Sequence, residues 1–255
     1  MLKITKAFYG LQRYILQKGG FSIMGEKDYS DREFLEAYNT IKKYITSGKL
    51  TQNNRITVLV NGQPGSGKSN YERNLSKSNV IIDTDEFRRF HPRIDSIKKL
   101  DAENYAERTQ EFASRITEKL VDELSKENYN LVIEGTMRTV HVPVNTCSKL
   151  KENGHEVNLV VVACDACNAW ESTIRRADEM IANHQKPRLV PIDKYDYNVQ
   201  HIAENLGEIC RLNCFDSISI VTRDGNPIDL NGKNPEEVLK DIINIDKWNN
   251  SKKQY

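Results

Sequence analysis

The chain lacks the features that would place it on a membrane or on nucleic acid. Its 37 Lys and Arg residues nearly balance its 36 Asp and Glu residues, leaving a formal net charge of +1. Such a balance provides no broad basic surface for nucleic acid or anionic lipid. No apolar run approaches the roughly 20 residues of a membrane-spanning helix, and the N-terminus shows no signal peptide. We therefore expect a cytoplasmic protein with neither nucleic acid nor membrane as a partner.

Cysteine is scarce, and the number of cysteines is odd, which favours free thiols in a cytoplasmic chain. The five residues are Cys147, Cys164, Cys167, Cys210 and Cys214. The C-x-x-C spacing of Cys164 and Cys167 also occurs in zinc and redox sites. A zinc site would need two further ligands, for which Cys210 and Cys214 are the candidates. We favour buried, small hydrophobic side chains, because Cys164 ends an apolar strand.

Short apolar segments alternate with amphipathic segments along most of the chain. Strands are expected at 56–61, 80–83, 129–133, 157–163 and 217–221. Helices are expected at 31–48, 101–125, 142–151, 168–183, 192–212 and 235–245. This alternation predicts a three-layer α/β fold, in which helices cover both faces of a mostly parallel central sheet.

The length of 255 residues fits one large domain. We expect this domain to span 29–246. Residues 1–28 would form an N-terminal extension, either a true appendage or the product of a misassigned start. Residues 247–255 would form a polar C-terminal tail.

A glycine-rich segment between a strand and a helix is the strongest functional motif. It fits G-x-x-x-x-G-K-[ST], whose backbone N–H groups surround phosphates at a helix N-terminus. Lys68 would reach the β- and γ-phosphates, and the Ser69 hydroxyl would bind Mg²⁺. We therefore expect ATP and Mg²⁺ as ligands, with ATP held by Gly62, Gln63, Pro64, Gly65, Ser66, Gly67, Lys68 and Ser69.

Carboxylates follow two of the expected strands. Asp83 and Asp85 follow the second strand, and Glu134 follows the third. Since parallel strands end at one edge of a sheet, these acids should converge on the phosphates. One aspartate could orient Mg²⁺ or the loop, and Asp85 could accept a proton from an attacking hydroxyl. Capping of the following helix is the structural alternative, and it is compatible with catalysis.

Cations and hydroxyls complete the candidate site. Arg175 and Arg176 lie in the helix after the fourth strand, and Arg188 lies in the loop that follows. Phosphoryl transfer requires such charges over the transferring group, although a solvated helix face is the usual role of a single arginine. Glu134, Thr136 and Arg138 could hydrogen-bond a hydroxylated substrate, or form an ordinary loop.

Residues 62–69, 82–92 and 129–143 together resemble the zeta toxin family. Members of this family are bacterial kinases of UDP-N-acetylglucosamine and the toxin halves of toxin–antitoxin pairs. The similarity extends from about residue 29 to about residue 225, and the string from 130 to 139 is more specific than the phosphate loop. The resemblance implies a P-loop kinase-like fold.

The resemblance also implies residue roles. Asp85 matches the base that deprotonates the sugar 3′-hydroxyl, and Arg176 and Arg188 match the arginines that neutralise the transferring phosphate. Positions that contact UDP-N-acetylglucosamine correspond to Glu118, Glu134, Arg138 and Thr146. In the family, a small helical antitoxin docks beside the nucleotide site and blocks ATP. Tyr195 departs from the pattern, because a His usually precedes the Asp at this point.

Two other functions remain open from the sequence. The chain could be a P-loop kinase of another small hydroxylated metabolite or antibiotic. It could instead be a catalytically silent nucleotide-binding partner protein, against which the set Lys68, Asp85, Arg176 and Arg188 argues.

Overall fold

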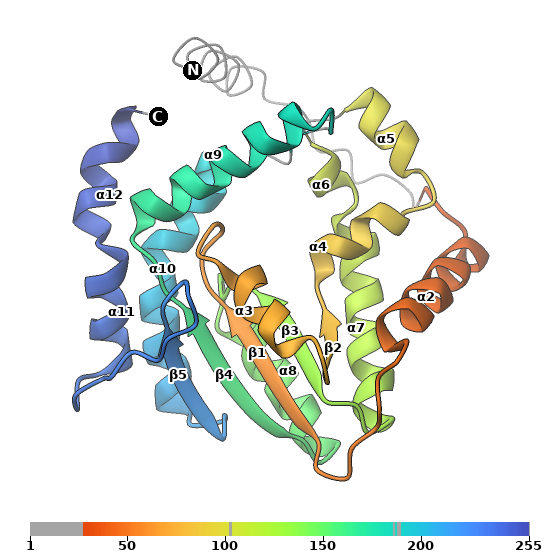
Figure 1. Ribbon diagram of the computed structural model, residues 1–255, viewed down its shortest axis with the longest axis horizontal. Coiled ribbons are helices and arrows are strands. Elements are labelled where there is room, and N and C mark those ends of the chain that lie inside the picture. Colours follow the sequence, from red (N-terminus) through yellow and green to blue (C-terminus); the bar gives the residue numbers. More distant parts are fainter. Residues whose placement is uncertain (1–27, 102–103, 186, 188–189, 255) are drawn as a thin grey trace.

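The centre of the molecule is a five-stranded sheet whose strands are all parallel. The computed structural model describes residues 28–101, 104–185, 187 and 190–254, so residues 1–27 of the expected extension lie outside the described residues. The strand order is β2-β3-β1-β4-β5 (Figure 1). Its members are β1 (Ile56–Asn61), β2 (Val80–Ile82), β3 (Leu131–Gly135), β4 (Glu156–Val162) and β5 (Ser217–Val221). The predicted α/β class is confirmed.

Alternation along the strands divides the apolar side chains between two cores. Leu59, Ile133 and Leu159 belong to the larger core, whereas Val60 and Val132 belong to a smaller one. Each buried aliphatic side chain contributes about 1.5–3 kcal/mol of favourable transfer free energy. The sheet is therefore covered on both faces.

Several helices contribute to the larger core. They include α7 (Gln110–Lys126), α8 (His141–Glu152) and α10 (Ile192–Leu212). The opposite face is covered by α3 (Lys68–Leu75), whose Tyr71 and Leu75 pack against the smaller core. The other helices are α2 (Asp31–Thr46), α4 (Thr84–Phe87), α5 (Ile94–Leu100), α6 (Tyr105–Arg108), α9 (Ala166–Ala182), α11 (Pro235–Ile243) and α12 (Ile245–Ser251), with short 3₁₀ segments η1 (Arg88–Phe90) and η2 (Lys252–Gln254).

Helix α2 begins at a capped N-terminus. The Ser30 hydroxyl accepts a hydrogen bond from Glu33 N, and the Glu33 carboxylate accepts one from Ser30 N, so the two residues form a capping box. Phe34 and Tyr38 are buried at helical spacing on one side of α2. Tyr44 is 63% exposed, with the Arg89 guanidinium over its ring.

The helix predicted at 101–125 is interrupted. Thr109, with φ −97° and ψ 2°, separates α6 from α7, and its hydroxyl donates to Tyr105 O at 2.8 Å. The side chain of Thr109 is fully buried. Helical periodicity persists across this residue, so the sequence pattern did not reveal the break.

The expected polar tail also differs. Helix α11 ends at Asn244, which has φ 54°, and α12 starts directly after it. Trp248 of α12 is fully buried, with its ring centroid 4.9 Å from that of Tyr195 and 5.9 Å from that of Trp170. Its indole N–H donates to Asp196 Oδ1 at 2.8 Å. One buried indole thus anchors a segment that polar composition indicated as a tail.

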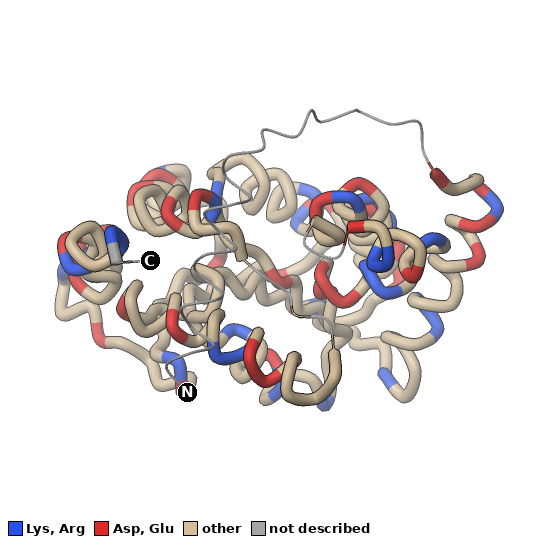
Figure 2. Tube along the Cα trace, turned by 90° about the horizontal axis from the view of Figure 1, so that it is seen from above, with Lys and Arg blue, Asp and Glu red and all other residues tan. Residues whose placement is uncertain are grey.

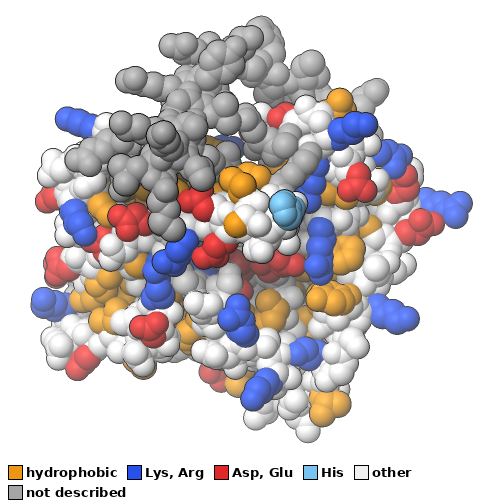
Figure 3. Space-filling view, turned by 45° about the horizontal axis from the view of Figure 1, so that its top comes forward, with side chains coloured by type: hydrophobic (Ala, Val, Ile, Leu, Met, Phe, Trp, Pro, Cys, Tyr) orange, Lys and Arg blue, Asp and Glu red, His pale blue; other side chains and the backbone are white. Residues whose placement is uncertain are grey.

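Charges of both signs are mixed over the surface. Lys and Arg alternate with Asp and Glu along the helices (Figure 2), and both signs are interspersed on the face drawn in Figure 3. Among the described residues, no helix is both long and apolar enough to cross a membrane. All five cysteines are free thiols.

Candidate active site

The glycine-rich loop connects the end of β1 to the start of α3. Gly65 and Gly67 have φ of 78° and 107°, a backbone conformation that favours glycine. A Cβ at Gly65 would lie 2.1 Å from Ala169 O of α9, and one at Gly67 would lie 2.8 Å from Arg223 Cγ. The loop is therefore closely enclosed, and its path requires residues without side chains.

Lys68 is held by the loop itself. Its ammonium donates to Gly62 O at 2.9 Å and to Gln63 O at 3.2 Å, and it lies 3.4 Å from Glu134 Oε1. The residue is only 6% exposed. Gln63 is also buried, and its amide donates to Cys164 O at the end of β4. These contacts fix the loop against the ends of two strands.

A cleft of about 580 Å³ lies along this edge of the sheet. It brings together the loop, the ends of β2 and β3, and side chains of α9 and α10. Among the residues singled out from the sequence, its lining includes Pro64, Gly65, Gly67, Lys68, Ser69, Asp83, Asp85, Glu134, Thr136, Arg138, Arg175 and Arg176. The carboxylates thus meet the phosphate loop as the topology predicted.

Asp83 and Asp85, which follow β2, have different hydrogen-bond partners. Asp83 caps α4, because its Oδ1 accepts a hydrogen bond from Asp85 N at 2.8 Å. Asp85 in turn accepts a hydrogen bond from Arg88 Nε at 2.9 Å. The capping role therefore falls to Asp83, and the Asp85 side chain lines the cleft.

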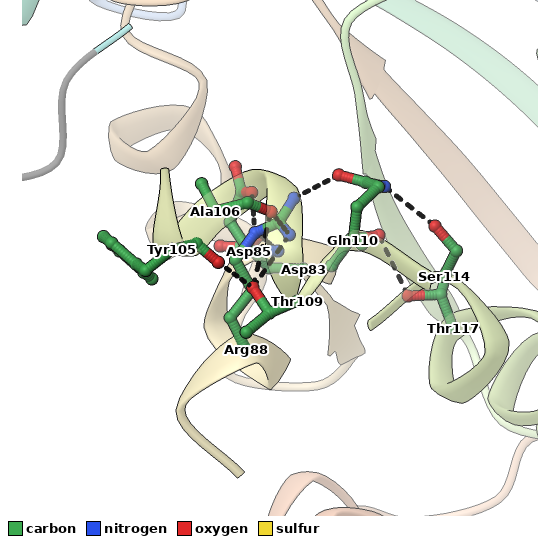
Figure 4. A network of polar contacts seen from close by, with 10 residues as sticks. Asp83, Asp85, Arg88, Tyr105, Ala106, Thr109, Gln110, Ser114 and Thr117 are labelled. Carbon is green, nitrogen blue, oxygen red and sulfur yellow. Dashed lines mark hydrogen bonds and ion pairs between the residues drawn. The ribbon is translucent and has the colours of Figure 1, made fainter. Parts of the chain in front are cut away.

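Arg88 is the centre of the polar network in Figure 4, and sequence analysis did not single it out. Its guanidinium also donates to Ala106 O, Thr109 Oγ1 and Gln110 Oε1. With 7% of its surface exposed, Arg88 is a buried cation whose fork is fully engaged. The network joins α4 to α6 and α7, and it holds Asp85 at the cleft.

Glu72 is a second residue that sequence analysis missed. It is 5% exposed on α3, and its Oε1 has no hydrogen-bond partner among the described residues. Burial, followed by the charges of Glu134 and Asp83, raises the pKa of Glu72 to about 8, with Lys68 opposing the shift. Its carboxyl is therefore mostly protonated at neutral pH. Its position one helical turn after Lys68 was the feature of the sequence that could have indicated a place near the phosphate loop.

Arg223 is a third missed residue. It follows β5, and its guanidinium donates to Gly65 O at 2.6 Å and to Ser172 Oγ at 2.9 Å. It lines the cleft beside the phosphate loop. Polar residues that follow the ends of parallel strands converge at one edge of the sheet. Applied to β5 as well as to the first three strands, this rule would have indicated Arg223.

Several predicted positions lie elsewhere. Glu118 is exposed on α7, and Thr146 donates its hydroxyl to Val142 O within α8; neither lines the cleft. Arg188 lies outside the described residues. Gly62, Gln63 and Ser66 are buried and are not among the residues that line the cleft. Tyr195, in place of the usual His, is fully buried and donates to Ala166 O at 2.6 Å, so this position belongs to the core.

The donor set suits the ligands that the loop implies. Ser69, Asp83 and Asp85 line one cleft, and carboxylate and hydroxyl oxygens are the ligands that Mg²⁺ prefers. The glycine conformations leave the loop backbone free to approach phosphate. The sheet is parallel, the phosphate loop follows β1, and acidic residues lie at the carboxyl ends of β2 and β3. This arrangement places the protein among the P-loop kinase-like folds.

The chain belongs to the zeta toxin family. A family model described as Zeta toxin matches residues 41–234. Toxin PezT of Streptococcus pneumoniae is 34% identical over 236 residues, covering 89% of this chain and 93% of that protein. Toxin zeta of Streptococcus pyogenes is 30% identical over 226 residues, covering 85% and 79%. Family and fold together support a phosphotransferase.

Solved structures agree. A structure of the PezAT chromosomal toxin–antitoxin system of S. pneumoniae matches with a TM-score of 0.76 and 32% identity, covering 84% of this chain and 88% of that one. A structure of AvrRxo1-ORF1:-ORF2 with ATP matches with a TM-score of 0.55 and 12% identity, covering 77% and 65%. The second likeness concerns the fold alone.

Proposed function

We propose that the protein is an ATP-dependent kinase that phosphorylates the 3′-hydroxyl of the N-acetylglucosamine moiety of UDP-N-acetylglucosamine. The observation that carries the proposal is the single cleft that Lys68 of the phosphate loop shares with Asp85 and Glu134. A phosphate donor and a hydroxyl acceptor need such a shared space, because phosphoryl transfer depends on alignment and on charge neutralisation. The likeness to a fold solved with ATP adds support for the donor.

The proposal assigns a role to each residue. Asp85 accepts the proton of the attacking hydroxyl as its oxygen bonds to the γ-phosphorus, and the bond to the bridging oxygen breaks to release ADP. Lys68 exchanges its loop carbonyl partners for phosphate oxygens. Arg176 and Arg188 neutralise the charge on the transferring group, although the Arg188 role rests on family resemblance alone.

Magnesium would be held by Ser69, with Asp83 within the same set of oxygen donors. When bound, the ion neutralises phosphate charge. Buried Glu72, kept neutral by its surroundings, would avoid adding a further negative charge beside Glu134 in the free protein. This arrangement would leave the phosphate side of the cleft open to an anionic nucleotide.

The sugar nucleotide would occupy the side of the cleft formed by Glu134, Thr136 and Arg138. Carboxylate, hydroxyl and guanidinium groups together can bind a hydroxylated, anionic ligand through directional hydrogen bonds. Glu118 and Thr146 are retained as substrate contacts from family resemblance. They do not line the cleft of the free protein, so contact would require closure around the ligand.

The protein would act as the toxin of a toxin–antitoxin pair in the cytoplasm, where ATP is available. The PezAT system supplies the precedent of a related toxin with an antitoxin. The proposed partner is a small helical protein that docks beside the nucleotide cleft and excludes ATP. Helix α2, with exposed Leu35 and Tyr44, is the surface that we propose for this contact.

The test is the product formed from ATP, Mg²⁺ and UDP-N-acetylglucosamine. Phosphorus NMR and mass spectrometry should detect a phosphate monoester at the sugar 3′ position. The Asp85→Asn variant should lose about 10²–10⁴-fold in kcat, the usual contribution of a general base, while binding ATP normally. Transfer to another acceptor in a parallel panel would redirect the substrate assignment, and full activity of Asp85→Asn would refute the base.

A further inference from the structure

The loop that follows β3 has an unusual backbone. Met137 has φ 50°, in the left-handed region, and its side chain is only 3% exposed. Such a conformation is unfavourable for a residue with a side chain, and it persists where neighbouring groups fix it. The residues on either side, Thr136 and Arg138, both line the cleft. The strained residue therefore lies between two candidate substrate contacts.

Two asparagines of α10 hold this loop. Asn198 Nδ2 donates to Thr136 O at 2.7 Å, and Asn205 Nδ2 donates to Met137 O at 2.9 Å. The two are seven residues apart, close to two helical turns, so they lie on one face of the helix. Consecutive carbonyls of the loop are thus fixed from one rigid element.

The orientation of the Asn198 amide follows from its partner. A carbonyl oxygen can only accept, so the amide nitrogen must face Thr136 O. The other end of the amide, Oδ1, is buried and has no partner among the described residues. An apolar side chain in place of Asn198 would remove this unsatisfied acceptor, but it would also leave Thr136 O without its donor. What asparagine contributes at this position is therefore the amide N–H that holds the loop carbonyl.

The loop on the nucleotide side of the cleft is held by other groups. Its carbonyls accept hydrogen bonds from Lys68 and Arg223. The two sides meet where Lys68 lies 3.4 Å from Glu134 Oε1, an ion pair in which neither asparagine takes part. A change in the asparagine contacts should therefore affect mainly the acceptor side of the cleft.

We propose that Asn198 and Asn205 are positioning residues that hold Thr136 and Arg138 in the geometry that binds the phosphate acceptor. The identity of that acceptor rests on the proposed function above. Both asparagines hold the backbone of the loop, and α10 also contributes Lys194 and Asn198 itself to the cleft wall. Asn205 is not among the lining residues, so Asn205→Leu tests the backbone contact by itself. The helix thereby couples the acceptor loop to the wall of the same cleft.

Kinetics of three variants test the proposal. Asn198→Leu and Asn205→Leu each remove one donor, and each should raise the KM for UDP-N-acetylglucosamine roughly five- to tenfold, the equivalent of about one hydrogen bond. The KM for ATP should stay within twofold of wild type. Asn153→Leu is the matched control, because its amide donates to Ser125 Oγ at the opposite edge of the sheet. It should change neither KM.

An unchanged acceptor KM in both loop variants overturns the proposal, as does an equal rise in the two KM values. If wild-type protein transfers no phosphate to UDP-N-acetylglucosamine, the proposed function fails, and amide hydrogen exchange decides the inference separately. Faster exchange confined to residues 136–140 in both loop variants, but not in Asn153→Leu, supports it. Exchange equal to wild type in that segment refutes it.

Discussion

The two sides of the cleft are built by different means. The nucleotide side is a continuous stretch of chain, in which glycines set the backbone and Lys68 closes the loop on itself. The acceptor side depends on contacts between distant elements: Arg88, which holds Asp85, is itself held by Thr109, and Asn198 of α10 holds Thr136. A local motif is robust because its parts are consecutive. An assembled surface can vary in specificity while the motif stays fixed.

We expect the largest effect when one methyl group is added to the phosphate loop, the local motif of this comparison. Gly65→Ala would place Cβ 2.1 Å from Ala169 O, so the loop must move. Displacement of about 1 Å at a reacting centre can cost about 100-fold, and we expect kcat/KM for ATP to fall by about that factor. Steady-state kinetics measure it.

Gly48→Ala is the matched control for that variant. Gly48 has φ 70°, similar to the 78° of Gly65, but a Cβ there meets nothing within 4 Å. It should lower stability by about 1 kcal/mol through backbone strain, with normal activity. Equal activity of the two alanine variants would show that crowding by α9 does not shape the loop.

Replacing Arg88 tests the assembled side. Arg88→Lys keeps the charge but loses the planar fork that bridges Asp85 to the α6–α7 junction. We expect kcat to fall about tenfold with unchanged ATP affinity, because two or more hydrogen bonds that orient the base are lost. Single-turnover kinetics and ATP titration measure the two quantities.

Arg89→Lys provides the comparison, since Arg89 is a neighbouring arginine with an exposed side chain, 3.7 Å from Glu86. Its replacement should leave kcat unaltered. A similar loss in both variants would assign the effect to the helix as a whole instead of to the fork.

Glu72 gives a pH-dependent comparison. Its pKa of about 8 in the folded protein exceeds the ordinary value of 4.5, so the folded state binds more protons between these values. The free energy of unfolding should therefore fall as pH rises from about 4.5 to 8, by a few kcal/mol, on the order set by the shift. Urea unfolding across this range should show a shallower fall for Glu72→Gln. A steeper fall in that variant would reverse the assigned sign.

The smallest effect is expected away from the cleft. Tyr195→Phe removes the hydroxyl that donates to Ala166 O but keeps the buried ring. Stability should drop by about 1 kcal/mol, and kcat should be unchanged. A loss of kcat would give this position a catalytic role that its core location does not suggest.

Sequence patterns predicted the structural features that depend on residues close together in the chain. Strand β1 and helix α10 were located by their apolar periodicity, and the convergence of Asp85 and Glu134 followed from parallel topology. The network of Arg88 and the contact of Arg223 with Gly65, 158 residues away, depend on tertiary approach. Without the fold, an arginine after a strand or in a short helix resembles any solvated side chain.

The burial of Trp248 has a consequence for biosynthesis. Its indole completes an aromatic group with Trp170 and Tyr195, which belong to the helices α9 and α10 that wall the cleft. A growing polypeptide carries the phosphate loop long before it carries residue 248. Until residue 248 has left the ribosome, α9 and α10 lack this packing partner, so the cleft wall cannot reach its final packing before that tryptophan emerges.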